Sequence, residues 1–437
     1  MSSLGKWLAI VGLSAIVVVI TWLPQLLASK SPAGGPVVEV WAWNTAADSL
    51  NALASSYTQR TSDVHIDVIR NGTDMQTRFL LSLAGGVGAP DVCQLQEREV
   101  GKFTESGRLM DLTDYAARYG PDFAPAAWAN CQFDSKTLAI PWDLGPCAVF
   151  YKRWVFDRYG VDPDTIETWD DFIAAGKQIH EASGGQTHMM SLSSGDLSEF
   201  FQILMQQAGG SVFNDRGEIA MDVPGNQRAL EVMRALLDSG TTAQLEWMEK
   251  LSSFNSDAVA CYPMAVWFGQ YIKDYAPDTA GEWGVFRLPA LEPGGLRTSN
   301  LGGSVLVIPD QGDERKQAWD YVEYVTCVAE SQVRQYRDYG LFPAYLPALT
   351  DPYFDEPDPF FGGQRVHRLF SADIEKVRPL TRTKDWAEAE RYLRQTLSTW
   401  AAGMDHQRYL AESADALGRK LGRPVAAGAS DPRGVTE

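Results

Sequence analysis

The chain has 437 residues, of which 45% are hydrophobic and 22% are charged. This length exceeds one ordinary hydrophobic core and predicts two domains, and the composition is that of a globular protein rather than a disordered one. The net charge of −18 argues against a nucleic-acid partner and against docking on anionic lipid, because both need a basic face.

An uncharged apolar segment lies near the N-terminus, from Trp7 to Ala28, after a single Lys6. It is long enough to span a bilayer core, which needs about 20 apolar residues. We therefore expect a signal anchor over residues 1–28 that leaves the rest of the chain outside the membrane. A cleaved signal peptide is the alternative, with a small-residue cleavage site at 31–33. Residues 29–36 are expected to form a linker.

Strands and helices alternate after this linker. Residues 37–43, 64–69 and 90–95 have the apolar pattern of strands, and residues 48–61 and 75–86 that of helices. This alternation predicts an α/β fold with a largely parallel sheet and helices on both faces. Ligands of such sheets bind beyond the carboxyl ends of the strands, which makes the side chains at 43–45 and 94–97 candidates for a site.

The middle of the chain continues with an extended run, punctuated by Pro and Gly, at 138–156. Thr168 is expected to cap a helix that has acidic residues in its first turn. Further helices are expected at 198–208 and 225–240, with a hairpin around 215–217 between them. Two later strands are expected at 281–289 and 299–309.

Five cysteines are present: Cys93, Cys131, Cys147, Cys261 and Cys327. An exported chain can oxidise its thiols, and Cys131 with Cys147 would close a short loop, but the odd count leaves at least one cysteine without an intramolecular partner. Alternatively, the cysteines are small buried apolar residues. Neither a metal nor a cofactor is expected, since no Cys/His spacing typical of a metal site occurs.

Five segments resemble, in order and spacing, motifs of the family 1 extracellular solute-binding proteins, the maltose-binding-protein-like group. The segments are GGVGAPDVCQLQ (85–96), the crossover block that begins AIPWDLGPC (139–179), QQAGGSVFNDRGEIAMD (206–222), GEWGVFRLPALEPGGLRTSNLGGSVLVIP (281–309) and QAWDYVEYVT (317–326). The resemblance covers about residues 37–420, which is nearly all of the part expected to be exported.

The resemblance implies a two-lobed periplasmic-binding-protein-like α/β fold. Each lobe would be a mainly parallel sheet flanked by helices, with a ligand cleft between the lobes and closure by hinge motion. Lobe 1 would comprise 37–143 and 286–327, and lobe 2 would comprise 147–284 and 328–420. Residues 421–437 are expected to form a flexible tail.

The resemblance also implies a function: the extracytoplasmic substrate-binding component of an ABC importer, and not an enzyme. Its partners would be a small carbohydrate and the permease subunits of the transporter, and the chain would be a monomer. The alternatives are a binding protein for a non-sugar solute such as a polyamine, a receptor that signals, and a secreted glycosidase. A glycosidase would need two suitably spaced carboxylates, but no catalytic motif occurs in a supporting context.

A sugar has apolar C–H faces and a rim of hydroxyl groups, so its site needs aromatic side chains and planar polar groups. The first candidates are Trp142 and Asp143, at the crossover that is expected to form the cleft floor. The other candidates lie at strand ends, in Gly-rich turns or at positions that match family contacts: Trp43, Asn44, Gln96, Glu97, Asp196, Glu199, Trp267, Asn300, Gly302, Gly303 and Trp386. For the tryptophans, packing in the hydrophobic core is the alternative.

Overall fold

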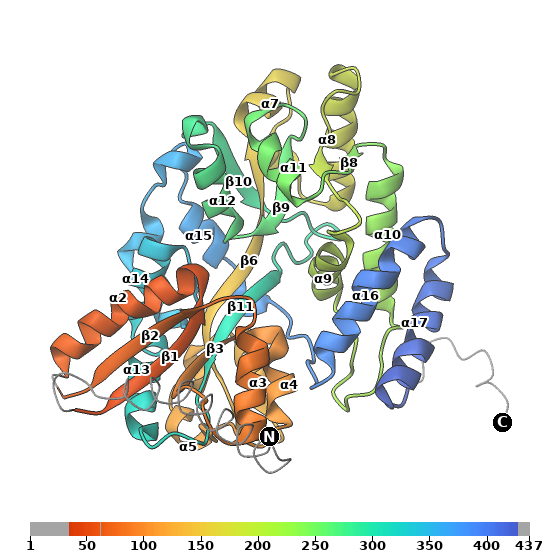
Figure 1. Ribbon diagram of the computed structural model, residues 1–437. Coiled ribbons are helices and arrows are strands. Elements are labelled where there is room, and N and C mark those ends of the chain that lie inside the picture. The colour runs from red at the N-terminus through yellow and green to blue at the C-terminus, as the bar shows by residue number, and fades with distance from the viewer. Residues whose placement is uncertain (1–34, 62, 427–437) are drawn as a thin grey trace, which may run out of the picture.

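The computed structural model of the chain describes residues 35–61 and 63–426. It consists of two α/β lobes, one above the other in Figure 1, and one long strand runs through both of them. That strand, β6 (Ile140–Lys152), corresponds to the extended run predicted at 138–156. The predicted anchor or signal segment over 1–28 lies outside the described residues.

The sheet of lobe 1 has the strand order β2–β1–β3–β11–β6. Its first three strands, β1 (Val37–Trp43), β2 (His65–Asn71) and β3 (Val92–Gln96), form two parallel pairs, as predicted. β11 (Asn300–Val307) is antiparallel to both β3 and β6, because it returns from lobe 2 beside the strand that leaves lobe 1. The two-lobed α/β architecture is confirmed, but the sheet is mixed, so the prediction of a mainly parallel sheet holds only for its first three strands.

The sheet of lobe 2 is built on the second half of β6. Both neighbours of this half, β9 (Cys261–Ala265) and β10 (Trp283–Arg287), are antiparallel to it. The prediction of a mainly parallel sheet is therefore wrong for this part of lobe 2. The remaining strands are short: β4 (Gln132–Phe133), β5 (Lys136–Thr137), β7 (Met190–Ser191), β8 (Thr242–Ala243) and β12 (Phe342–Pro343).

Helices flank the sheets of both lobes (Figure 1). Lobe 1 carries α2 (Asn44–Arg60), α3 (Met75–Gly85), α4 (Val100–Thr104), α5 (Thr113–Ala116), α6 (Pro125–Ala129), α13 (Arg315–Thr326) and α14 (Ala329–Tyr339). Lobe 2 carries α7 (Arg153–Tyr159), α8 (Trp169–Ala182), α9 (Leu197–Ala208), α10 (Pro224–Asp238), α11 (Trp247–Ser252), α12 (Phe268–Tyr275), α15 (Val366–Ser371), α16 (Trp386–Ala401) and α17 (His406–Leu421).

Local signals in the sequence predicted where helix α8 begins and where helix α3 ends. The Thr168 hydroxyl accepts a hydrogen bond from the backbone N–H of Asp171, and the Asp171 carboxylate accepts one from the backbone N–H of Thr168, which together form a capping box for α8. Gly86 ends α3 in the left-handed conformation, with φ of 72°, where a residue without a Cβ avoids strain.

The helix α14 packs on lobe 1, although the sequence suggested that lobe 2 resumes at residue 328. Arg334 of α14 donates a hydrogen bond to Ser56 of α2, and Glu330 forms an ion pair with Arg60 at 3.1 Å. The following β12 pairs with β6 at Leu144 and Asp143. We therefore propose that residues 329–343 belong to lobe 1 and that the chain re-enters lobe 2 after them.

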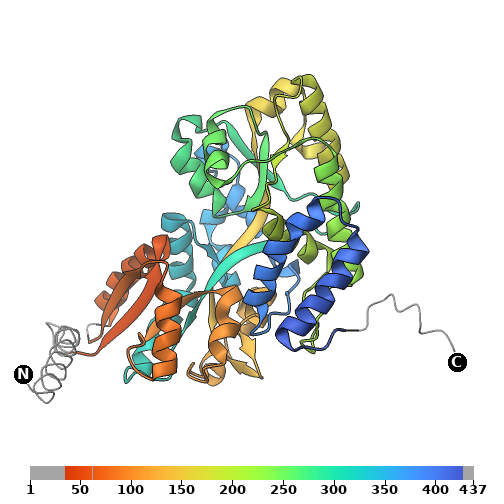
Figure 2. The ribbon, with the colours of Figure 1, turned by 45° about the vertical axis from the view of Figure 1, so that its right-hand side comes forward.

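The helix α16 packs along α9 of lobe 2 and also contacts α4 of lobe 1 (Figure 2). Two ion pairs support this contact between the lobes. Glu390 of α16 lies 2.8 Å from the Arg98 guanidinium, and Lys384, just before α16, lies 2.5 Å from Glu105. The lobes are therefore linked at one side of the molecule as well as through β6 and β11.

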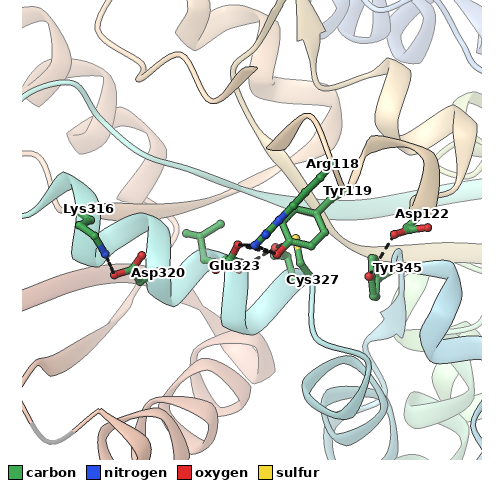
Figure 3. Close-up of polar contacts among 10 residues, drawn as sticks. Arg118, Tyr119, Asp122, Lys316, Asp320, Glu323, Cys327 and Tyr345 are labelled. Carbon is green, nitrogen blue, oxygen red and sulfur yellow. Dashed lines mark hydrogen bonds and ion pairs between the residues drawn. The ribbon is translucent and has the colours of Figure 1, made fainter. Parts of the chain in front are cut away.

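A polar cluster fastens the loop after α5 to α13 in lobe 1 (Figure 3). Arg118 and the Tyr119 hydroxyl both donate hydrogen bonds to the Glu323 carboxylate, each at 2.6 Å. Burial, with the nearby negative charge of Glu323, raises the pKa of Tyr119 to about 12. The tyrosine therefore stays a neutral donor at ordinary pH.

All five cysteines are buried and carry free thiols, which agrees with their interpretation as small apolar core residues rather than as disulfide partners. Burial raises the pKa of the Cys327 thiol to about 12. Across residues 35–61 and 63–426, no helix is long and apolar enough to cross a membrane. The same described part of the chain holds no cluster of three or more His, Cys, Asp or Glu residues that could bind a metal ion.

Candidate functional site

A cleft of about 710 Å³ lies between the two lobes. Lobe 1 contributes the ends of β1 and β3 and the start of α2, lobe 2 contributes α9 and α12, and the crossing strands β6 and β11 contribute the floor. Eight of the predicted site residues line the cleft: Trp43, Asn44, Gln96, Asp143, Glu199, Trp267, Gly302 and Gly303. The cleft thus lies beyond the carboxyl ends of the parallel strands, where the topology places it.

Asp143 lies on the cleft floor, in the first half of β6. Hydrogen bonds from the backbone and side chain of Ser304 reach its carboxylate, and its Oδ1 atom is buried without a hydrogen-bond partner among the described residues. Burial raises the pKa of Asp143 to about 7, with a further contribution from Glu97, while the bonds from Ser304 act in the opposite direction. This carboxylate can therefore accept another hydrogen bond.

Trp142 does not reach the cleft, and the prediction that it stacks on a ligand is corrected. Successive side chains of a strand point to opposite faces of the sheet, so Trp142 and Asp143 cannot both face the cleft. The Trp142 side chain is fully buried in the hydrophobic core, and its carbonyl oxygen accepts a hydrogen bond from Gln335 at 3.2 Å. The alternative, packing at the crossover, holds for this residue.

The Gly-Gly turn of β11 allows the two crossing strands to approach each other at the floor. Gly302 and Gly303 have φ of 85° and 119°, in the region that favours glycine. A Cβ at Gly303 would lie 2.7 Å from the backbone carbonyl oxygen of Asp143. Beside this turn the Trp267 indole N–H donates to the carbonyl oxygen of Leu301 at 3.1 Å, which fixes the ring at the cleft wall.

The edge of lobe 1 holds the candidates at the ends of β1 and β3. The Gln94 side chain links these strands to β11, because it accepts from the Trp43 backbone N–H at 3.2 Å and donates to the Ser304 hydroxyl at 3.0 Å. Asn44 follows with φ of 49° and is exposed. Gln96 also faces the cleft, and its side-chain oxygen accepts from Arg98 at 2.9 Å.

Glu97 lies behind the cleft wall instead of in the cleft. Its buried carboxylate accepts a hydrogen bond from Asn130 and forms an ion pair with Arg382 at 3.2 Å. Burial raises the pKa of Glu97, and the charge of Arg382 and the bond from Asn130 oppose the shift. We therefore expect Glu97 to position Arg382, which lines the cleft, rather than to contact ligand itself.

Three further predicted residues also lie outside the cleft lining. The Asp196 carboxylate accepts from Ser193 and forms an ion pair with Lys250 at 2.5 Å. The Asn300 side chain bridges the crossing strands, since it accepts from the Gly145 N–H at 2.9 Å and donates to the Gly302 carbonyl at 2.8 Å. Trp386 is buried against Phe213, and the Arg382 guanidinium lies 5.1 Å from the centre of its ring.

The wall of lobe 2 contains residues that the sequence analysis missed. Gln270, Tyr271 and Asp274 line the cleft from α12, next to Trp267. Positions 267, 270, 271 and 274 share one face of a helix, so helical spacing from Trp267 was a signal that could have revealed them. Gln202 of α9 lies on the same wall, beside Glu199, whose pKa is raised by burial.

The charges of the cleft are distributed unevenly. Its three arginines are each paired with a carboxylate: Arg70 with Asp48, Arg98 with Glu390, and Arg382 with Glu97. In contrast, the cleft carboxylates of Asp143, Glu199 and Asp274 form no ion pair within the described part of the chain. The polar groups of the cleft that form no ion pair are therefore these three carboxylates and the amides of Asn44, Gln96, Gln202 and Gln270, and they suit a neutral or cationic ligand better than an anionic one.

The family of bacterial extracellular solute-binding proteins matches residues 42–327 of the chain. An arabinooligosaccharide-binding protein of Halalkalibacterium halodurans is 28% identical over 294 residues, which are 66% of this chain and 65%, or just under two thirds, of that relative. A lactose-binding protein of Rhizobium radiobacter is 26% identical over 365 residues, which are 79% of this chain and 83% of the relative.

Solved structures share the fold along nearly the whole chain. The ABC transporter associated binding protein from B. animalis subsp. lactis Bl-04, in complex with beta-1,6-galactobiose, has a TM-score of 0.71 at 26% identity and covers 90% of this chain and 99% of its own. The sugar-binding protein MalE from Xanthomonas citri has a TM-score of 0.77 at 20% identity, with 88% and 97% of the two chains covered. At the latter identity the similarity concerns the fold alone.

Proposed function

Because the chain belongs to the family of bacterial extracellular solute-binding proteins, we propose that it is the extracytoplasmic substrate-binding component of an ABC importer and that its ligand is a sugar or oligosaccharide. The names of its relatives point to this ligand class, since they bind arabino-oligosaccharides and lactose and one structural neighbour holds beta-1,6-galactobiose. Permease subunits of the transporter are then its partners.

The composition of the cleft is the observation that carries this proposal. Trp43, Trp267 and Tyr271 offer aromatic rings for the C–H faces of sugars. Asp143 and the cleft amides offer planar groups that bond pairs of hydroxyls. A sugar hydroxyl that donates to Asp143 would supply the partner that its Oδ1 atom lacks. We therefore assign ligand contact to the eight predicted residues in the cleft and to Arg98, Gln202, Gln270 and Tyr271.

Closure of the lobes around the ligand follows from the connections between them. The strands β6 and β11 cross between the lobes at Gly145 and Leu301, where a Cβ at position 145 would collide with the Leu301 carbonyl oxygen. A few residues in such a crossing can absorb the backbone rotation of a hinge. We propose that a sugar bridging Asp143 on the floor and Trp267 on lobe 2 stabilises the closed arrangement.

We further propose a monomer without enzymatic activity, held at the membrane by the segment at residues 1–28. A cationic solute such as a polyamine is the second candidate ligand. The observation that favours it is the set of cleft carboxylates that form no ion pair within the described part of the chain, Asp143, Glu199 and Asp274, because a polyamine site needs acidic groups beside aromatic rings. No equivalent observation favours an anionic ligand, since each arginine of the cleft already has a carboxylate partner.

A thermal-shift screen tests the proposed ligand class. The panel holds arabino-oligosaccharides, lactose, beta-1,6-galactobiose, spermidine and galacturonic acid. A ligand that binds only the folded chain stabilises it by about 2.7 kcal/mol at a hundredfold excess over Kd, so a neutral saccharide should raise the melting temperature. A shift with spermidine and with no saccharide would contradict the carbohydrate proposal. Chromatography of the bound sugar after prolonged incubation should show it unchanged, and cleavage would contradict the absence of enzymatic activity.

A further inference from the structure

Exposed aromatic side chains gather on one part of lobe 2, at the outer end of the cleft. Among the described residues, four of the eight exposed large hydrophobic side chains lie on α11 and α12: Trp247, Met248, Tyr271 and Tyr275. They stand out because exposed apolar side chains scattered singly need no explanation, whereas a contiguous group marks a binding surface.

Two of these exposed rings, Tyr271 and Tyr275, form a row with the partly buried ring of Trp267 that continues the wall of the cleft. Trp267, Tyr271 and Tyr275 recur every four residues along one face of α12, which spaces them by about 6 Å along the helix. The ring centres of Trp267 and Tyr271 are 6.2 Å apart, and those of Tyr271 and Tyr275 are 6.5 Å apart. Trp267 and Tyr271 line the cleft, while Tyr275 does not, so the row runs from inside the cleft to its exterior.

Trp247 of α11 extends this surface sideways. Its ring centre lies 5.4 Å from that of Tyr271, with an angle of 85° between the two ring planes, and 39% of the residue is exposed. On the same helix as the row, Gln270 and Asp274 line the cleft and share a hydrogen bond of 2.8 Å. Aromatic faces beside an amide and a carboxylate are the groups that a sugar chain needs, because it presents C–H faces and hydroxyls together.

We propose that Tyr271, Tyr275 and Trp247 form an outer saccharide-binding site, which holds the units of an oligosaccharide that project from the cleft. We call these three residues the outer aromatic track. The inference rests on the proposed function of the cleft, and it names the ligand class more closely: an oligosaccharide longer than a disaccharide. Continuity with the cleft, through Tyr271, favours a sugar chain over a protein partner as the occupant of this surface.

Titration calorimetry with ligands of graded length tests the proposal. The probes are the arabino-oligosaccharides and the beta-1,6-galacto-oligosaccharides, each from the disaccharide to the hexasaccharide. The Tyr275→Ala and Trp247→Ala variants should bind the hexasaccharide about tenfold more weakly than the wild type and the disaccharide equally well. Tyr275→Phe should retain the wild-type affinity, since it keeps the ring. Tyr115→Ala, which removes an exposed tyrosine of lobe 1, is the matched control.

Two results would overturn the inference while leaving the proposed function intact. One is a wild-type affinity that does not rise between disaccharide and hexasaccharide, and the other is a Tyr275→Ala variant that binds every length as the wild type does. The second result would make a protein partner, such as a permease subunit, the better explanation of the exposed rings. Failure of every saccharide in both series and in the thermal-shift screen would instead refute the proposed function, and the outer aromatic track with it.

Discussion

The Asp143→Asn substitution should separate stability from binding in this chain. The carboxylate is buried at the cleft floor, accepts hydrogen bonds from Ser304 and has one oxygen without a partner among the described residues. An amide keeps the shape and the ability to accept from Ser304 but carries no charge. We therefore expect the variant to be more stable than the wild type at neutral and alkaline pH, and to bind ligand more weakly.

The size of the effect follows from the two pKa values of Asp143. Its pKa is about 7 in the folded chain, against 3.8 for an ordinary aspartate. The difference between these pKa values corresponds to a change of at most about 4 kcal/mol in the free energy of unfolding between acidic and alkaline pH. Since the folded-state pKa is raised, this stability is fully present below about pH 4 and is lost as the pH rises to about 7. The asparagine variant has no such loss.

Urea unfolding at a series of pH values, from about 4 to about 8, measures the difference. The variant and the wild type should be similar at the acidic end, and the variant should gain an advantage of about 2–4 kcal/mol toward the alkaline end. Asp274→Asn removes a carboxylate from an exposed position of the cleft and serves as the matched control. An Asp143→Asn advantage that does not change with pH would refute the reasoning.

Two pairs of substitutions test the geometry of the floor and of the core. Gly303→Ala places a Cβ 2.7 Å from the Asp143 carbonyl oxygen at φ of 119°, whereas Gly363→Ala meets no atom within 4 Å at φ of 79°. In urea unfolding, Gly303→Ala should lower the free energy of unfolding by about 2–3 kcal/mol. Gly363→Ala should lower it by about 1 kcal/mol. Trp142→Ala should lower the free energy of unfolding by about 3–5 kcal/mol, because the side chain is fully buried. Trp267→Ala should lower it much less and should weaken ligand binding. Equal losses of stability in the two variants would contradict the placement of Trp142 in the core and of Trp267 at the cleft wall.

Much of the fold could be predicted because its signals are local. The alternation of apolar strands and helices predicted β1, β2 and β3 and their parallel pairing. Thr168 and Gly86 predicted helix ends, since a hydroxyl cap and a residue without a Cβ act within one turn. The antiparallel direction of β11 depends on how the chain returns between the lobes, and a short-range pattern holds no information about that.

The candidate site could be predicted in part. The end of a strand indicates where along the sheet a residue lies, but it does not indicate to which face the side chain points. Trp142 and Asp143 are neighbours on β6, but the alternation of strand side chains sends only Asp143 into the cleft. The sequence did not reveal that Glu97 forms a buried ion pair with Arg382, because the two residues are distant along the chain. The α12 residues needed only the helical spacing from Trp267, which the sequence contains.

Titration calorimetry of the wild type, Trp267→Ala and Asp143→Asn with the saccharide that gives the largest thermal shift tests the central claim most directly. If the cleft between the lobes is a saccharide-binding site, the wild type should bind one ligand per chain. Each variant should remain folded and bind about tenfold more weakly or not at all. Wild-type affinity in both folded variants would show that the saccharide binds elsewhere and would contradict the account.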